Sequence, residues 1–313
     1  MEQAMSARPA AAGVLAAAIL ATGLAAPSAA QPLPPRPGET RNIAAACAGK
    51  DGWAQPAPPA RLFGRTYYVG TCGITALLVE TRAGLVLLDA GVPEAAPLVL
   101  ENIRRLGFSP RMVRWIVISH EHYDHAGAVA AIQRETGARV IAGPFQSDIL
   151  SSGKPSPEDP QAPLLEKEPM QPLQVAYAVR NNGTLNAGSV VFTAHATPAH
   201  SPGSTSWTWR ECEGAVCRTI AYADSATTIS ADGYRFADNP KRVGEVRSGI
   251  AKIAALPCDI IVTPHPSSSG LFPRMSGIKP LALPGSCRTY ADAALKRFEE
   301  RLASETRPVS AAK

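Results

Sequence analysis

The 313-residue sequence has no CxxC pair, no dense cluster of Lys and Arg, and few charged residues. Without CxxC pairs, a cysteine-based metal site is disfavoured. The basic residues are scattered and the formal net charge is only +5, so the sequence shows no basic cluster of the kind that binds nucleic acids. Hydrophobic residues make up 45% and charged residues 18%, a composition that excludes wholesale disorder.

The first thirty residues differ from the rest of the chain. Arg8 precedes an Ala- and Leu-rich stretch at 10–26, which small residues follow up to Ala30. This pattern predicts a secretory signal peptide at 1–30, cleaved before Gln31, because the stretch is short and Ala-rich for a membrane span. A retained anchor is the alternative. No Cys lies near the cleavage point, so we expect an exported, periplasmic protein with no lipid or membrane anchor.

Short β-like runs alternate with helical patterns in the mature chain. We expect strands at 66–71, 74–80, 85–89, 115–118, 139–142, 190–194, 206–210, 218–223 and 259–263. We expect helices at 93–106, at 125–137 and near the C-terminus, where Ala294, Leu295, Phe298 and Leu302 share one face. Residues 31–61 predict an irregular N-terminal arm, and 151–173 predict a long functional or mobile connection. Because strands followed by helices occur twice with no flexible linker, we expect one α/β domain over 31–313, with two facing sheets and helices outside.

The densest group of ionisable side chains follows the strand expected at 115–118. The segment SHEHYDHAG places four candidate ligands within six positions: His120, His122, Asp124 and His125. Imidazole nitrogens and carboxylate oxygens are the ligands that zinc prefers where no thiolate is present. The first two side chains can point at one metal, and the last two, at the start of a helix, can face a second point nearby. A solvated polar loop is the alternative.

A catalytic zinc ion takes three protein ligands and keeps one position for water. Four candidate ligands are therefore more than one zinc ion needs and fewer than two zinc ions need. His200, in TPAHSPGS, and His265, in VTPHPSSS, follow expected strands and can supply the missing ligands. His195 ends an apolar run and is expected to be a hydrogen-bonded structural histidine.

These motifs resemble the metallo-β-lactamase superfamily, whose fold is a four-layer αβ/βα sandwich. HEHYDHAG, the later His200 and His265, and GLVLLDAG at 84–91 carry the resemblance over nearly the whole mature chain. The resemblance implies two Zn²⁺ ions per chain, the first held by His120, His122 and His200, and the second by Asp124, His125 and His265.

Further segments resemble the subclass B3 β-lactamases of that superfamily. RTYYVGTCG at 65–73, HSPGSTSWTW at 200–209 and the absence of a cysteine ligand carry this narrower likeness. It implies that Ser225 contacts a substrate carboxylate, with Thr227 where a second serine is common. The sequence departs from the family at Thr227 and at Ala199, which replaces a usual glycine before His200.

The six cysteines allow 15 pairings, so spacing alone does not fix them. A turn-like insert makes a local bridge between Cys212 and Cys217 plausible. The pair Cys258 and Cys287 corresponds to a disulfide recurrent in subclass B3. The additional Cys47, Cys72, Cys212 and Cys217 resemble its three-disulfide variants.

The resemblance implies hydrolysis of a β-lactam amide by a hydroxide that bridges the metals, and hence antibiotic resistance. Asp124 would bind metal and orient that hydroxide. The partner would be a small-molecule β-lactam, and no protein partner is implied. A lactonase or thioesterase of the same fold, with Asp224 bridging the metals, is the main alternative. A nuclease and a non-enzymatic zinc-binding protein are more remote ones.

Overall fold

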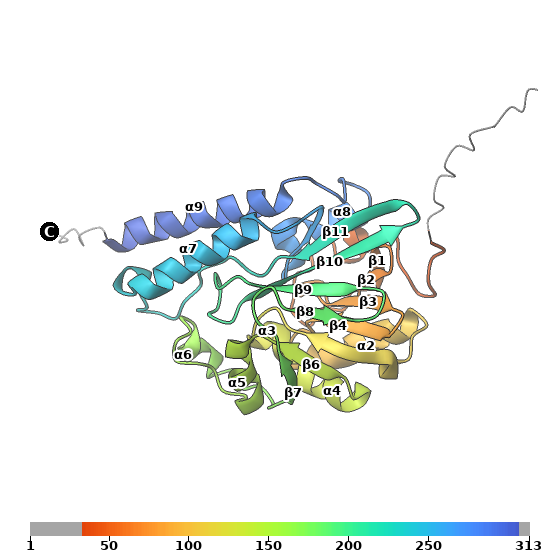
Figure 1. The fold of residues 1–313 in the computed structure, drawn as a ribbon, viewed down its shortest axis with the longest axis horizontal. Coiled ribbons are helices and arrows are strands. Elements are labelled where there is room, and N and C mark those ends of the chain that lie inside the picture. Colours follow the sequence, from red (N-terminus) through yellow and green to blue (C-terminus); the bar gives the residue numbers. More distant parts are fainter. Residues whose placement is uncertain (1–32, 307–313) are drawn as a thin grey trace, which may run out of the picture.

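The computed structural model describes residues 33–306, which form two β-sheets packed face to face with helices on both outer faces (Figure 1). The first sheet has the order β1-β2-β3-β4-β5-β6-β7. Its strands are β1 (Ala60–Phe63), β2 (Thr66–Tyr68), β3 (Leu77–Thr81), β4 (Gly84–Leu88), β5 (Val113–Val117), β6 (Arg139–Ala142) and β7 (Val175–Ala178). Strands β1 to β4 pair antiparallel, and β4 to β7 pair parallel.

The second sheet has the order β12-β11-β10-β9-β8. It contains β8 (Thr184–Asn186), β9 (Val191–Ala196), β10 (Thr205–Glu213), β11 (Val216–Tyr222) and β12 (Ile260–Val262). Only β11 and β12 pair parallel. Their parallel pairing brings the residues after β12 to the same edge as the residues after β11.

Helices cover the outer face of each sheet, which gives four layers (Figure 1). Against the first sheet pack α2 (Ala96–Arg105) and α4 (Val129–Thr136), and against the second pack α7 (Pro240–Ala254) and α9 (Ser286–Thr306). The shorter helices are α1 (Ile43–Ala46), α3 (Tyr123–Ala126), α5 (Pro144–Ser152), α6 (Ala162–Leu165) and α8 (Leu271–Met275). The expected four-layer α/β sandwich is confirmed.

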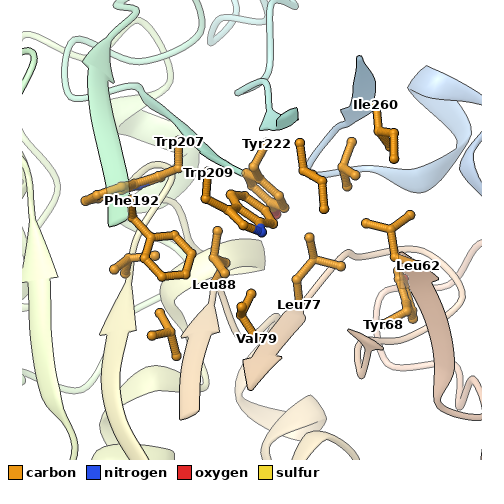
Figure 2. Packing of buried hydrophobic residues seen from close by; sticks show 14 of the residues in the cluster. Leu62, Tyr68, Leu77, Val79, Leu88, Phe192, Trp207, Trp209, Tyr222 and Ile260 are labelled. Atoms are coloured by element: carbon orange, nitrogen blue, oxygen red, sulfur yellow. The ribbon is translucent and has the colours of Figure 1, made fainter. Parts of the chain in front are cut away.

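The central core lies between the two sheets (Figure 2). Along β3, Leu77 and Val79 face the other sheet whereas Leu78 packs under the helices, as strand alternation requires. Two tryptophans of β10 also join the sheets by hydrogen bonds. Nε1 of Trp207 donates to the Ile118 carbonyl at 2.9 Å, and Nε1 of Trp209 donates to the Thr66 hydroxyl at 3.3 Å. These bonds satisfy indole donors that would otherwise be buried without partners.

Several expected elements differ from the observed ones. The helix expected at 125–137 begins earlier, at Tyr123, and is interrupted before Val129, so it forms α3 and α4. The expected connection at 151–173 contains α6 and the end of α5. Strands β1, β7 and β8 and helices α5 and α7 were not expected. Leu295 does not share the buried face of α9: it is 36% exposed, whereas Ala294, Phe298 and Leu302 are buried.

The arm before β1 is mostly irregular but carries α1 and is tied to the sheet region by a disulfide between Cys47 and Cys72. The other two disulfides join Cys212 to Cys217 and Cys258 to Cys287. The expected signal peptide at 1–30 lies outside the described residues. Among residues 33–306, no helix combines the length and apolar character needed to cross a bilayer.

Candidate metal centre

The histidine-rich segment leaves the end of β5 at the edge where the two sheets meet. Ser119, the first residue of the motif, is fixed by Asp89: its amide donates to Oδ1 at 2.7 Å and its hydroxyl to Oδ2 at 2.6 Å. Asp89 is fully buried and has a φ of 54°, in the left-handed region that few residues other than glycine adopt. The strain is consistent with a site whose side chains are held by the surrounding structure.

Three histidines from two loops form the first group. The ligand atoms of His120, His122 and His200 all lie within 4.8 Å of one another, and all three side chains are buried. The ring of His200 lies 4.9 Å, centroid to centroid, from each of the other two. The structure therefore brings His200, from the loop after β9, to the residues that follow β5.

A second group surrounds the carboxylate of Asp124, in the first turn of α3. Its Oδ2 atom lies 3.1 Å from Nε2 of His125 and 3.3 Å from Nε2 of His265, which follows β12. The rings of His125 and His120 are 4.3 Å apart, so the two groups adjoin. All six residues predicted as metal ligands thus converge at one edge of the sandwich.

Protein acceptors occupy one ring nitrogen of each histidine in the first group. Nδ1 of His120 lies 2.8 Å from Oδ1 of Asp224, and Nε2 of His122 lies 2.9 Å from Oδ2 of Asp159. Nδ1 of His200 donates to the Thr227 carbonyl at 2.8 Å. Such contacts fix the ring orientation and the tautomer, and they direct the opposite nitrogen towards the shared space. In His200 that nitrogen, Nε2, also lies 3.4 Å from the side-chain nitrogen of Gln161, which a metal would displace.

The surroundings also set the protonation of these rings. Burial, together with nearby His125 and His122, holds the pKa of His120 well below its usual value. Burial likewise lowers the pKa of His200, to about 3, so this ring is neutral at ordinary pH. Burial lowers the pKa of His122 too, but the hydrogen bond to Asp159 and neighbouring carboxylates outweigh it and raise the pKa to about 9.

Glu121 is an unexpected member of the site region. It is 3% exposed, and neither carboxylate oxygen has a hydrogen-bond partner among the described residues. Burial raises its pKa to about 7. Gly203 leaves space for it, because a Cβ at that position would lie 2.3 Å from Oε2 of Glu121. The glycine in HSPG is therefore needed for close packing beside the metal-facing loop.

Helix α7 supports the loop that carries His200. Arg242 is 5% exposed and donates from Nη1 to the Pro198 carbonyl at 2.7 Å and from Nη2 to the Ala199 carbonyl at 2.9 Å. At Gly249 a Cβ would lie 2.6 Å from the backbone nitrogen of Ala199. The backbone of α7 thus packs directly against the His200 loop, and the Arg242 side chain holds that loop by two hydrogen bonds to its carbonyls.

The remaining predicted residues lie near this centre in different environments. Ser225 is 5% exposed, and Thr227 is half-buried with its hydroxyl 3.0 Å from Nδ1 of His200. Asp224 is completely buried and contacts His120 rather than standing between the two groups. His195 lies outside the centre, with Nε2 2.8 Å from the Thr208 hydroxyl, as a structural histidine should.

Sequence reasoning missed two carboxylates that hold this centre in place, Asp159 and Asp89. Asp159 lies in the Pro- and Ser-rich connection, where no periodicity marks a functional side chain. Asp89 lies within the noticed GLVLLDAG segment, but its contact with Ser119 depends on the parallel pairing of β4 and β5. Such partners are recognised only once the strands are aligned.

The donor set fits a divalent metal. Nε2 of His120 and both ring nitrogens of His125 are buried without a hydrogen-bond partner among residues 33–306. Unpaired buried polar atoms are costly unless something binds them. Nitrogen and carboxylate donors in groups of three, with no thiolate, are typical of catalytic zinc centres.

Comparisons with known proteins agree with this geometry. Residues 69–217 match the model of the metallo-β-lactamase superfamily. The crystal structure of the metallo-β-lactamase MIM-1 from Novosphingobium pentaromativorans is 52% identical, has a TM-score of 0.83, and the match covers 85% of this chain and 98% of that one. MEM-A1, a subclass B3 metallo-β-lactamase from a soil metagenome library, is 38% identical with a TM-score of 0.77, over 81% of this chain and 98% of that one.

More distant curated relatives have other names. A hydroxyacylglutathione hydrolase of Anaeromyxobacter dehalogenans (strain 2CP-C) is 27% identical over 64% of this chain. A probable metallo-hydrolase of Bacillus subtilis (strain 168) is 26% identical over 39% of it. The matches span only 62% and 49% of those two proteins, whereas they span nearly all of MIM-1 and MEM-A1. By sequence and by fold, the chain belongs to the metallo-β-lactamase family, in its subclass B3.

Proposed function

We propose that this protein hydrolyses the amide bond of β-lactam antibiotics with two bound Zn²⁺ ions and thereby confers resistance to them. The observation that carries the proposal is the convergence of six ligand side chains in two adjoining groups of three. Three protein ligands per metal leave a coordination position open, as a catalytic centre requires and a purely structural site does not.

In this proposal His120, His122 and His200 hold the first zinc ion, and Asp124, His125 and His265 hold the second. Bound zinc lowers the pKa of a water molecule and polarises a carbonyl, so that a nucleophile is available near neutral pH. The carboxylate of Asp124 lies between His125 and His265 and would accept a hydrogen bond from the attacking water, which orients it.

The chain's other residues would position the substrate. Thr227 lies beside His200 and is the more accessible of the two residues proposed to contact the substrate carboxylate. Ser225 is almost fully buried, so its contact requires a small shift of the loop that carries it. The loop is joined to α9, because the amide of Ala226 donates to the Tyr290 hydroxyl at 2.9 Å.

A lactonase or thioesterase remains the second candidate, because a hydroxyacylglutathione hydrolase is among the relatives. In that reading Asp224 would bridge the metals. Oδ1 of Asp224 contacts Nδ1 of His120, on the opposite side of the ring from the unpaired Nε2, which favours the β-lactamase. Oδ2 of Asp224 is buried without a partner among residues 33–306, so the activity screen below decides between the two candidates.

We also propose that residues 1–30 direct export to the periplasm and that 31–313 form one mature domain without a membrane anchor. The three disulfides support export, because disulfides persist in oxidising compartments. Mass spectrometry of protein from a periplasmic extract should give an N-terminus at Gln31.

The decisive experiment measures hydrolysis of a penicillin, a cephalosporin and a carbapenem beside S-lactoylglutathione and a homoserine lactone. We expect β-lactam turnover that a chelator abolishes and zinc restores, with two zinc ions per chain by elemental analysis. His200→Ala should lose activity on every substrate, whereas His195→Ala should retain it. Turnover of the thioester or lactone but of no β-lactam would overturn the substrate assignment.

A further inference from the structure

The segment 223–235, which we call the β11 loop because it follows that strand, orients two histidines of the first group. Oδ1 of Asp224 lies 2.8 Å from Nδ1 of His120. The Thr227 carbonyl accepts from Nδ1 of His200 at 2.8 Å. Although the β11 loop makes these contacts, it contains no strand or helix. Its backbone therefore needs partners from other parts of the chain to keep its position.

The same loop is joined to the segment that orients the third histidine of this group. The amide of Ala231 donates to the Pro160 carbonyl at 2.8 Å. Pro160 directly follows Asp159, whose Oδ2 lies 2.9 Å from Nε2 of His122. A shift of the β11 loop would thus reach all three rings that are proposed to hold the first zinc ion.

One side chain of α9, the helix on the outer face of the second sheet, spans the β11 loop (Figure 1). Nη1 of Arg301 donates to the Thr228 carbonyl. Its Nη2 donates to the Ser230 hydroxyl at 2.7 Å and to the Tyr234 carbonyl at 3.3 Å. Its Nε donates to Glu305, one turn further along α9, at 2.7 Å. The planar guanidinium, with five donors in a fixed arrangement, allows one side chain to serve these four acceptors at once.

The position of this guanidinium is itself well defined. Cζ of Arg301 lies 4.5 Å from the centroid of the buried Phe236 ring. Nearer the start of α9, the hydroxyl of Tyr290 accepts from the amide of Ala226 at 2.9 Å. Two side chains of one helix therefore hold the β11 loop on either side of Thr227.

We propose that Arg301 is a positioning residue of the metal centre, which fixes the Thr227 carbonyl and through it the ring of His200. Thr227 directly precedes Thr228, whose carbonyl the guanidinium holds. Within residues 33–306 the hydrogen bonds of Arg301 go to the β11 loop and to Glu305, so its effect on a metal is indirect. Its effect on substrate binding rests on the proposed function, whereas its effect on metal binding can be measured without any substrate.

The zinc affinity of Arg301→Gln, measured by competition with a metal-binding dye, tests this role. We expect one of the two zinc ions to bind about tenfold more weakly, at the lower end of the usual effect of removing a direct partner of a ligating histidine. The other ion should bind as before, because the contacts of the β11 loop are with the first group. Arg247→Gln is the matched control, since Arg247 of α7 pairs with Glu299 of α9 through two hydrogen bonds of 2.7 Å and does not contact the β11 loop.

Arg301→Lys separates positioning from charge. Lysine keeps the positive charge but presents its donors from a single nitrogen, so it cannot reach the acceptors on both sides. We therefore expect zinc binding as weak as in Arg301→Gln, and faster hydrogen exchange of the amides at 226–231 in both variants. With zinc in excess, both should raise KM for a penicillin by a larger factor than they lower kcat, because Ser225 and Thr227 lie on the β11 loop.

Ser230→Ala provides a milder test should Arg301→Gln fail to fold, because it removes one acceptor and leaves α9 intact. It should weaken the same zinc ion to a smaller extent. Equal zinc affinities in Arg301→Gln and Arg247→Gln, equal weakening of both zinc ions, or full recovery in Arg301→Lys would overturn the proposal. A wild-type protein that hydrolyses no β-lactam, but in which Arg301→Gln selectively weakens one zinc ion, would overturn the proposed function and still support this role of Arg301.

Discussion

Each histidine of the first group has one ring nitrogen against a protein acceptor, and these acceptors decide which nitrogen faces the metal. His122 contacts Asp159 through Nε2, whereas His120 and His200 use Nδ1 for Asp224 and Thr227. The acceptors therefore select Nδ1 of His122 and Nε2 of the other two as ligand atoms.

Asp159→Asn should weaken metal binding by about 10- to 100-fold, the usual effect of removing a partner of a ligating histidine. An amide nitrogen facing Nε2 would favour the tautomer in which Nδ1 carries the proton, and that tautomer cannot ligate. Competition with a metal-binding dye gives the affinity. Glu158→Gln is the control, because Glu158 is an exposed neighbour whose ion pair with Lys241 is remote from the rings. Equal affinities for the two variants would show that Asp159 does not position His122.

Metal binding should release a proton from His122 at pH 7. With a pKa of about 9, this ring is charged in the metal-free protein and must lose its proton to ligate. Apparent zinc affinity should therefore rise about tenfold per pH unit from pH 7 towards 9 for each proton displaced. Titration calorimetry in buffers of different ionisation enthalpy counts the protons. His200, with its pKa lowered to about 3, contributes none in this range.

The same shift makes the metal-free protein's stability depend on pH. Because the folded pKa of His122 lies above its ordinary value of 6.5, the added stability is fully present below pH 6.5 and is lost as pH rises through about 9. Asp159→Asn should reduce both this dependence and the proton release. Zinc binding at pH 7 without any proton release would contradict the protonation assigned to His122.

The six candidate ligands could be proposed from the sequence because four of them share one short motif and the other two each follow a recognisable strand. The structure then brings the two distant candidates to the motif: the rings of His200 and His120 are 4.9 Å apart, and Nε2 of His265 lies 3.3 Å from Oδ2 of Asp124. Asp159 was missed because nothing local distinguishes it from other acidic residues, whereas Glu121 was passed over although it lies between His120 and His122 in the motif. Their importance arises only from burial beside His122.

At the scale of elements, the parallel strands β4, β5 and β6 of the first sheet were predicted well because they are largely buried and read as apolar runs. Helix α7 was missed although the chain carries signals for it, with Pro240 at its first position and Val246, Ile250 and Ile253 at helical spacing. Strands β7 and β8 lack such signals, since most of their side chains are partly or fully exposed. Pairing with β6 and β9, rather than their own pattern, makes them strands.

Helix α7 offers a matched pair of glycines with opposite expectations. Gly249→Ala should destabilise the fold by about 1–3 kcal/mol, because its Cβ would press on the backbone of Ala199, next to His200. Gly244→Ala should stabilise by about 0.5–1 kcal/mol, since that exposed position has nothing within 4 Å and alanine favours a helix. Urea unfolding of both variants gives the free energies, and zinc affinity should fall only for Gly249→Ala. The same sign for both would show that α7 does not touch the His200 loop as described.

At the scale of the whole molecule, the metal centre lies where the two halves of the sandwich meet. His120, His122, Asp124 and His125 follow the first sheet, whereas His200 and His265 follow strands of the second. Each group of three includes ligands from both halves, so a bound metal would link the sheets at this edge. The hydrogen bond from Trp207 to Ile118 links them close to the same place.

Removing the metal should therefore loosen this edge before the rest of the core. Ligand binding adds about 4.1 kcal/mol of stability when the free ligand is at 1,000 times its dissociation constant, so a chelator should lower the melting temperature and zinc should restore it. In hydrogen exchange, amides at 119–126, 199–205 and 265–270 should exchange faster after chelation. The tip of β10 and β11 is the internal control, because the Cys212–Cys217 disulfide holds it outside the centre. Equal acceleration of exchange at that tip would mean that the metals stabilise the whole fold. Continued protection of the amides at 199–205 after chelation would mean that the His200 loop keeps its position without a metal.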